Sequence, residues 1–578
     1  MPTIQSVDEF DVCIVGSGAG GGMAAHELSR AGARVVLLEA GPDWDAARDG
    51  AMLTWNYASP RRGRSTPDKP FGEFDGCIGG WEIEGEPYTR AEGTEWDWWR
   101  ARMLGGRTHH WGRISLRFGP NDFRRKSIDD RGDDWPINYD EIKPYYDRVD
   151  RLIGIFGSEE GIFNEPDGVF LPPPKPRCHE LLIKKGADKV GIPVIPARLS
   201  ILTRSHGGRA QCHYCGQCGR GCATRSNFSS QAVLLPPAIE SGNLTIVTNA
   251  MAREVLSNAE GRATGVSYVD TLTREERQIR AQIVVLAASA CESARLMLNS
   301  KSPRHPNGIG NSSGLVGRYL MDSTGSDAMA FVPQLVDHPM HNDDGVGGAH
   351  LYIPWWRDLD RSLPFARGYH MEMWGGRGMP GYGFGGGIQR LNGRLNGGDR
   401  TRGGGGYGVQ LKDDYRRLWG SFLGLSGRGE MIARYENYCA IDENVVDKYG
   451  IPVLKFDVTW SDEELLQMKH FHESAHEIFE AMGAEPMWGI PDRESGYGIL
   501  APGRIIHEVG TTRMGDQPQS SVVNEYCQSH DVDNLFVMDA GPFVSQADKN
   551  PTWTIMALAM RSSEHLVGEV LKRNLPTA

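Results

Sequence analysis

The chain has 578 residues, of which 39% are hydrophobic and 24% charged, and its formal net charge is −12. This length exceeds what one hydrophobic core usually serves, so we expect two or three lobes. The acidic excess argues against binding of nucleic acid, whose phosphates require a surface rich in Lys and Arg. No apolar run approaches the roughly 20 residues of a membrane helix, so we expect no membrane insertion.

The opening residues, MPTIQSVDEFDVCIVG, lack a basic region followed by an apolar core, so we expect no secretory signal. Taken alone, the chain is predicted to fold in the cytoplasm. Residues 374–408 are rich in glycine and lack apolar periodicity, which predicts a loop.

The first forty residues follow the order strand, glycine loop, helix, strand and acid. Residues 11–16 form a short apolar run that predicts a buried strand. In the loop that follows, Gly16 permits a tight turn, Gly18 lets the backbone approach a pyrophosphate, and Gly21 lets the helix pack on the strand. Glu39 ends the second strand, where it can bind a ribose hydroxyl. The pattern predicts a dinucleotide site without separating FAD from NAD.

Together with this fingerprint, HEVGTTRMG (507–515) and the segment 533–566 resemble the glucose–methanol–choline oxidoreductases. Residues 101–123 resemble the flavin-contacting Gly-Gly loop of that family, and residues 254–297 resemble its later sheet strands. The resemblance implies an α/β protein that binds FAD. Its Rossmann-type FAD-binding lobe is expected to be discontinuous, and its substrate lobe is expected to be a sheet covered by helices.

The resemblance also divides the chain and assigns cofactor contacts. The expected parts are an FAD-binding lobe at 1–125, 230–325 and 501–578, a connecting region at 126–229 and a substrate-binding lobe at 326–500. The expected FAD contacts are Gly16, Gly18, Gly21, Glu39, Gly105, Gly106, His110, Ala252, Asp539, Ala540 and Thr552. Some relatives tether flavin through a histidine placed like His110, so this contact is predicted to be either covalent or noncovalent.

Oxidation of an alcohol removes a proton from oxygen and a hydride from carbon, and flavin can accept the hydride. In the family a His and a second His or Asn face the flavin, and His507 and Asn550 match these positions. The resemblance therefore assigns His507 as the base and Asn550 as the group that orients the substrate oxygen. Many members carry a His where this chain has Ser323, so flavin contacts are not carried over there.

A compact cysteine motif lies between residues 212 and 222. The four cysteines, with the spacing C-x₂-C-x₂-C-x₃-C of a ferredoxin iron–sulfur loop, are Cys212, Cys215, Cys218 and Cys222. We favour an iron–sulfur cluster, of the 4Fe-4S type. Zinc is an alternative because four thiolates suit a tetrahedral site, and a loop without metal is another. Ala223 stands where the ferredoxin motif has proline.

The resulting functional hypothesis is an FAD-dependent dehydrogenase that oxidises a secondary hydroxyl of a sugar or glycoside, with carbon 3 preferred. The cluster would pass electrons to an external acceptor. The chain resembles flavin subunits of bacterial sugar dehydrogenases and pyranose oxidases. In the dehydrogenase complexes a small partner subunit carries the export signal and a cytochrome often takes the electrons, which would place the protein in the periplasm.

Several alternatives are kept. One is an oxygen-using pyranose or glycoside oxidase without a cluster, another is a long-chain alcohol dehydrogenase, and a third is a noncatalytic flavin-binding subunit. The segment HESAH (472–476) matches the zinc-protease pattern, but no third ligand follows, so we interpret it as a solvated helix.

Overall fold

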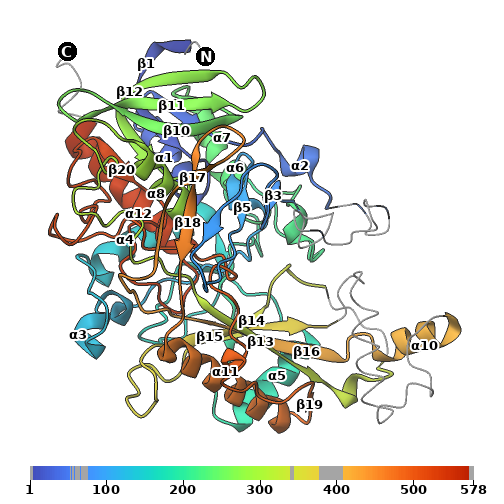
Figure 1. The fold of residues 1–578 in the computed structure, drawn as a ribbon. Coiled ribbons are helices and arrows are strands. Elements are labelled where there is room, and N and C mark those ends of the chain that lie inside the picture. The colour runs from blue at the N-terminus through green and yellow to red at the C-terminus, as the bar shows by residue number, and fades with distance from the viewer. Residues whose placement is uncertain are drawn as a thin grey trace.

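The computed structural model describes residues 4–52, 54, 58, 66, 76–338, 344–376 and 408–571. These residues form two lobes, which lie at the top and the bottom of Figure 1. Most of the predicted glycine-rich loop, 374–408, lies outside the described residues. Among the residues described, no helix combines the length and apolar character needed to cross a membrane.

The upper lobe is built on a seven-stranded sheet. In spatial order its strands are β10 (Ala250–Ser257), β11 (Ala263–Asp270), β12 (Glu276–Leu286), β1 (Ile4–Val15), β2 (Val35–Leu38) and β9 (Leu244–Val247), and β20 (Leu535–Val537) pairs with the last residues of β12. Strands β20, β12, β1, β2 and β9 are parallel, whereas β10 and β11 are antiparallel. This topology confirms the predicted Rossmann-type lobe.

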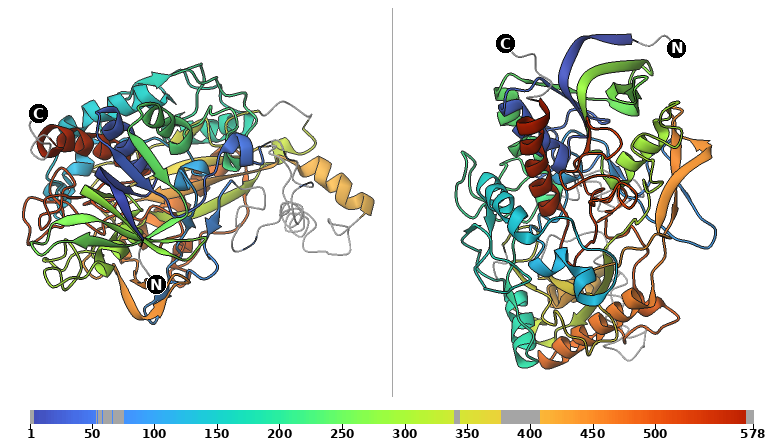
Figure 2. Two further views of the ribbon diagram at one scale, coloured as in Figure 1. Left: turned by 90° about the horizontal axis from the view of Figure 1, so that it is seen from above. Right: turned by 90° about the vertical axis from the view of Figure 1, so that its left-hand side faces the viewer.

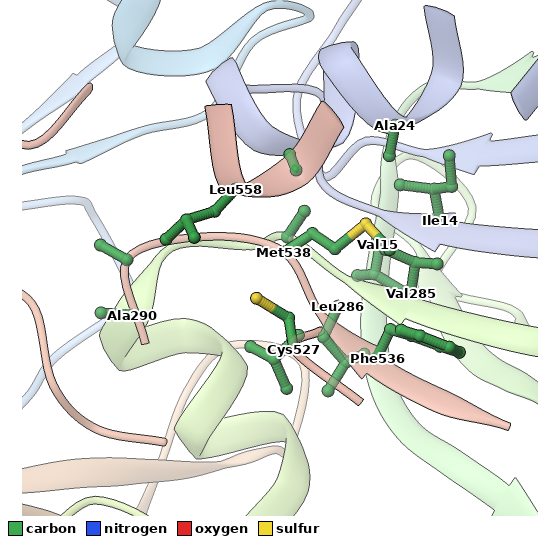
Figure 3. Packing of buried hydrophobic residues seen from close by; sticks show 14 of the residues in the cluster. Ile14, Val15, Ala24, Val285, Leu286, Ala290, Cys527, Phe536, Met538 and Leu558 are labelled. Carbon is green, nitrogen blue, oxygen red and sulfur yellow. The ribbon is translucent and has the colours of Figure 1, made fainter. Parts of the chain in front are cut away.

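Helices cover this sheet and bury its parallel strands. Helix α1 (Ala19–Arg30) packs against α12 (Thr552–His565), and α12 packs against α4 (Tyr139–Ile153). Figure 3 shows Leu558 of α12 in the same buried cluster as Met538 and Val285 of the sheet region. All four residues of β2 are buried, as expected for a parallel strand covered on both faces. The two ends of the chain therefore share one core.

The lower lobe is an antiparallel sheet of six strands. Their order is β19 (Glu485–Pro486), β13 (Thr324–Phe331), β16 (Phe422–Gly429), β15 (Tyr369–Gly375), β14 (Leu351–Ile353) and β8 (Ile195–Pro196). Helices α11 (Asp462–Ala481) and α5 (Cys178–Lys189) cover it (Figure 1). The predicted second lobe, a sheet covered by helices, is confirmed. Strand β8 and helix α5 come from the segment 126–229.

A small sheet lies along one side of the upper lobe, where its longer strands are orange in Figure 2. It contains β17 (Tyr438–Val446), β18 (Pro452–Asp457) and β4 (Thr89–Arg90), and it packs against α8 (Ala290–Asn299) of the upper lobe. The shorter elements are α2 (Ala46–Asp49), β3 (Gly79–Gly80), β5 (Arg100–Ala101), η3 (Gly106–His109), η4 (Pro120–Phe123), α3 (Arg125–Asp129), β6 (Ile155–Phe156), β7 (Phe170–Leu171), η5 (Cys218–Arg220), α6 (Ser230–Val233), α7 (Leu235–Glu240), η6 (Pro333–Leu335), α10 (Gly408–Leu418), η7 (Gly496–Gly498) and η8 (Leu566–Leu571).

Candidate active site

The turn between β1 and α1 forms a cradle that requires glycine. Gly16 has φ +98°, and a Cβ there would lie 2.3 Å from the carbonyl oxygen of Ala287. A Cβ on Gly21 would lie 1.9 Å from the carbonyl oxygen of Gly16. By contrast, a Cβ on Gly18 would meet nothing within 4 Å. Gly18 is the N-cap residue of α1, and because it has no side chain, the first N–H groups of the helix receive no side-chain cap. The positive end of α1 therefore opens into free space that suits a diphosphate.

Glu39 lies at the end of β2, where it is 6% exposed and faces the same space. Its Oε2 accepts a hydrogen bond from Ser17 Oγ at 2.5 Å, and its Oε1 accepts one from the Gly41 N–H at 2.9 Å. Burial raises the pKa of Glu39, although these hydrogen bonds and Arg102 act in the opposite direction. A buried carboxylate beside the glycine cradle fits recognition of a ribose diol.

One cavity brings together residues from every predicted part of the FAD-binding lobe. Predicted site residues that line it are Gly16, Gly18, Glu39, Gly106, His110, Ala252, His507, Asp539, Ala540, Asn550 and Thr552. Gly21 instead packs behind the turn. Gly105 has φ +91° and its N–H donates to Ser17 Oγ at 2.8 Å. The cradle, the ribose-facing carboxylate and the shared cavity fit FAD, and the individual roles, including the bond at His110, stay predictions.

His507 and Asn550 meet in this cavity. Asn550 Nδ2 lies 3.2 Å from Nε2 of His507, and Asn550 Oδ1 is buried without a hydrogen-bond partner in the described part of the chain. Burial lowers the pKa of His507 to about 3, so its imidazole is neutral near pH 7. A neutral imidazole and an unsatisfied amide oxygen that face a cavity can together hold a hydroxyl group.

Three residues without a role assigned from the sequence, Asp322, Ser323 and Gln546, form hydrogen bonds at or next to His507. Ser323 Oγ lies 2.9 Å from His507 Nδ1, and Gln546 Nε2 donates to Ser323 Oγ at 3.0 Å. Asp322 Oδ1 accepts a hydrogen bond from the main-chain N–H of His507 at 2.8 Å. Burial raises the pKa of Asp322 to about 7, and Glu508 adds to the effect. Ser323 appeared in the sequence only as a departure from the family pattern. Its proximity to His507 depends on the pairing of segments that lie far apart in the chain.

A second cavity, of about 630 Å³, adjoins the first, and Gly112 and Ile114 line both. Its walls come mainly from the lower lobe and include His370, Glu372 and Trp374 of β15. These residues carry no local signal in the sequence, because their pattern is that of an ordinary strand. The second cavity gives a substrate room beyond the His507–Asn550 pair.

A buried ion network holds the segment that precedes Asn550. Lys549 is 2% exposed, and its Nζ lies 2.6 Å from Asp548 Oδ1, 3.1 Å from Asp122 Oδ2 and 3.4 Å from Glu165 Oε1. Although burial opposes its charge, these three carboxylates raise the pKa of Lys549. The network anchors the backbone from which Asn550 projects.

The four loop cysteines are free thiols: Cys212, Cys215, Cys218 and Cys222. The Tyr214 N–H donates to Cys212 Sγ and the Gly347 N–H donates to Cys218 Sγ, each at 3.3 Å, while Cys215 lines the second cavity. In the part of the chain that the structure describes, no group of three or more His, Cys, Asp or Glu side chains is arranged to hold a metal ion. The predicted iron–sulfur cluster is therefore not supported.

The HESAH segment lies on α11, as predicted, but only part of it is solvated. His472 is 1% exposed, and its Nε2 lies 2.8 Å from Ser326 Oγ of β13. Glu473 is exposed and pairs with Lys469 at 3.1 Å. His472 thus helps to pack α11 on the lower sheet.

Comparison with known proteins agrees with this geometry. The family models for GMC oxidoreductase match residues 83–324 and 434–559, which together are more than half of the chain. A model for an FAD binding domain matches residues 9–47.

Three curated relatives align along nearly their whole length. The 2-methyl-1,2-propanediol dehydrogenase of Mycolicibacterium austroafricanum is 29% identical, with 97% of this chain and 96% of the relative covered. Paromamine 6'-oxidase of Streptomyces fradiae is 29% identical, with 98% and 92% covered. The fructose dehydrogenase large subunit of Gluconobacter japonicus is 25% identical, with 97% and 98% covered.

Proposed function

This chain belongs to the GMC oxidoreductase family, and on that premise we propose that it oxidises a hydroxyl-bearing carbon of a sugar or glycoside with FAD. The observation that carries the proposal is one cavity that holds both the dinucleotide cradle at Gly18 and the His507–Asn550 pair. A cofactor held by the cradle would therefore share its space with a base and an amide. Two of the three relatives named above take their names from a saccharide or an amino sugar.

The hydrogen bonds of His507 leave its Nε2 unprotonated, as a proton acceptor requires. Asn550 Nδ2 donates to His507 Nε2, so the ring proton belongs on Nδ1, which donates to Ser323 Oγ. When a substrate hydroxyl enters, Nε2 is the acceptor for its proton. Asn550 can then donate from Nδ2 to the substrate oxygen.

The start of α1 and Glu39 would hold FAD, which would supply the acceptor for the hydride. The protein positions the substrate oxygen between His507 and Asn550 and receives its proton at Nε2. The pKa of about 3 keeps His507 in its basic form at neutral pH.

The position oxidised and the electron acceptor are finer parts of the proposal. We keep carbon 3 of a pyranose as the preferred position. A dehydrogenase with an external acceptor remains our preference over an oxidase, and the small partner subunit and cytochrome remain proposed partners. The preference for a dehydrogenase and for carbon 3 comes from the cysteine loop together with the family resemblance, so the metal content of that loop tests both. The polar groups of the second cavity, His370 and Glu372, disfavour a long-chain alcohol.

Anaerobic mixing with a panel of monosaccharides and glycosides tests the proposal. At least one saccharide should bleach the flavin absorbance, and NMR of the product should identify the oxidised carbon. Reoxidation by air compared with an artificial one-electron acceptor separates oxidase from dehydrogenase. Iron, zinc and acid-labile sulfide per flavin decide whether the cysteine loop holds a metal. A flavin that no saccharide reduces would contradict the proposal.

A further inference from the structure

We propose that Glu372 determines substrate class by binding a second hydroxyl or an amino group of the saccharide, and that it rejects sugar acids. The inference rests on the proposed function, because the first hydroxyl is the one held by His507 and Asn550. The expected substrates are therefore neutral or amino saccharides.

Strand β15 directs Glu372 into the second cavity. Side chains of a strand alternate between its two faces. Tyr369, Met371 and Met373 belong to the apolar core of the lower lobe. The intervening residues, His370, Glu372 and Trp374, line the second cavity, and Met373 near the end of the strand also reaches it. The register of one strand thus places a carboxylate and an aromatic ring on the same wall.

Glu372 retains unused capacity to accept hydrogen bonds. Its Oε1 lies 3.4 Å from His370 Nε2 and its Oε2 lies 4.0 Å from Arg428 Nε, so neither contact is short. Its side chain is 26% exposed, on a residue that lines the cavity. Although burial opposes ionisation, His370 and Arg428 lower the pKa of Glu372 to about 2. An ionised carboxylate accepts hydrogen bonds from hydroxyl or ammonium groups and repels a second carboxylate.

The guanidinium groups of this cavity are already engaged. Arg177 Nη2 lies 3.0 Å from Glu180 Oε1, and Arg198 Nη2 lies 3.2 Å from Asp167 Oδ1. A sugar acid would have to compete with these carboxylates for Arg177 or Arg198. Glu372 instead can accept a hydrogen bond from a neutral or cationic group, and no short ion pair has to be broken, because its own contacts with His370 and Arg428 are 3.4 Å and 4.0 Å long.

Glu372 is also connected to the proposed reaction centre. His370 Nδ1 donates to the main-chain oxygen of Asp548, two residues before Asn550. The same imidazole contacts Glu372 through Nε2. The cavities that contain His507 and Glu372 share Gly112 and Ile114. A ring with one hydroxyl at Asn550 can therefore extend toward Glu372.

The test compares Glu372→Gln with the wild-type holoenzyme on glucose, glucosamine and glucuronate as probes. Anaerobic flavin reduction gives kcat/KM, and calorimetry on the oxidised holoenzyme gives binding independently of turnover. Glu372→Gln should weaken binding of glucosamine and glucose by roughly 10- to 100-fold, since the charged acceptor becomes a neutral amide. Binding of glucuronate should stay unchanged or improve.

The exposed carboxylate of Glu473, on α11, provides the matched control: Glu473→Gln should change none of these values. An equal loss for all three probes, or an unchanged preference, would overturn the assignment of Glu372. A wild-type enzyme that shows the binding preference but no flavin reduction would contradict the proposed function and leave the role of Glu372 supported. A wild-type enzyme without a preference against glucuronate in binding would overturn the inference.

Discussion

Nδ2 of Asn550 lies 3.2 Å from Nε2 of His507. Asn550 directly precedes Pro551, the N-cap of α12, so this contact connects the start of α12 to the segment that carries His507. The two residues face one cavity together with the glycine cradle of α1. A substrate hydroxyl that enters this cavity can therefore meet both side chains.

Removal of the base should slow the reductive half-reaction. We expect His507→Ala to retain FAD and to lower the rate of flavin reduction by roughly 100- to 10,000-fold, the range for a positioned general base. Stopped-flow absorbance under anaerobic conditions measures this rate. His476→Ala, on the half-buried part of α11, is the control and should react like wild type. A normal rate in His507→Ala would exclude it as the base.

Ser323 should act as a positioning residue through His507 Nδ1. Ser323→Ala removes the 2.9 Å contact, and we expect kcat to fall about tenfold while KM changes little, because the substrate is not touched directly. Ser323→Thr restores the hydroxyl and should recover most of the loss. Equal kinetics for the Ala and Thr variants would show that the hydroxyl does not orient His507.

Asp322 should make stability depend on pH. Folding raises its pKa from an ordinary value near 4 to about 7, so the folded state binds a proton more tightly than the unfolded state. The contribution of Asp322 is fully present below pH 4 and is lost as the pH rises through about 7. In this interval its share of the slope is roughly −1.4 kcal/mol per pH unit.

Urea unfolding of wild type and Asp322→Asn between pH 5 and 7 measures this slope. The variant should lack the contribution, because its amide does not titrate. Parallel pH profiles of the free energy of unfolding would contradict the raised pKa of Asp322.

Two glycines of the cradle should respond differently to a methyl group. Gly18→Ala places Cβ in free space, so the protein should fold but bind FAD more weakly. Gly21→Ala drives Cβ against the Gly16 carbonyl at 1.9 Å, so it should lower the melting temperature of the apoprotein. Flavin content and thermal unfolding separate the two effects. Full flavin occupancy in Gly18→Ala would argue against close approach of the cofactor there.

The buried Lys549 should stabilise the fold because three carboxylates depend on it. Lys549→Met leaves Asp122, Asp548 and Glu165 with less compensation, and we expect a loss of about 3–5 kcal/mol in the free energy of unfolding. Lys469→Met removes a surface pair with Glu473 and should cost at most about 1 kcal/mol. Chemical denaturation measures both. Similar losses in the two variants would contradict the role of the network.

The sequence alone determined the dinucleotide fold at its start. Strand, glycines, helix and acid lie within forty residues, so local sterics and hydrogen bonding fix their geometry. The same segment predicted the roles of Gly16 and Gly21, and the close contacts of both glycines agree with those roles. Resemblance to a family then supplied the discontinuous lobe and the pair His507 and Asn550.

The cysteine motif defines separation along the chain, whereas ligation depends on whether the four sulfur atoms face one point. In the structure, Cys212 and Cys218 accept hydrogen bonds from the backbone amides of Tyr214 and Gly347. Among the described residues nothing supports the predicted cluster, so the metal content of this loop stays a prediction.

Only the tertiary structure decided the surroundings of the base. Ser323, Glu372 and Gln546 come from separate parts of the chain, and each looks ordinary within its own segment. Burial by the two packed lobes, together with contacts across their cavities, sets the pKa of His507 and the partner at its Nδ1. Desolvation and long-range contacts arise only when the whole chain folds, so the sequence singled out His507 as the proposed base but not the environment that sets its pKa.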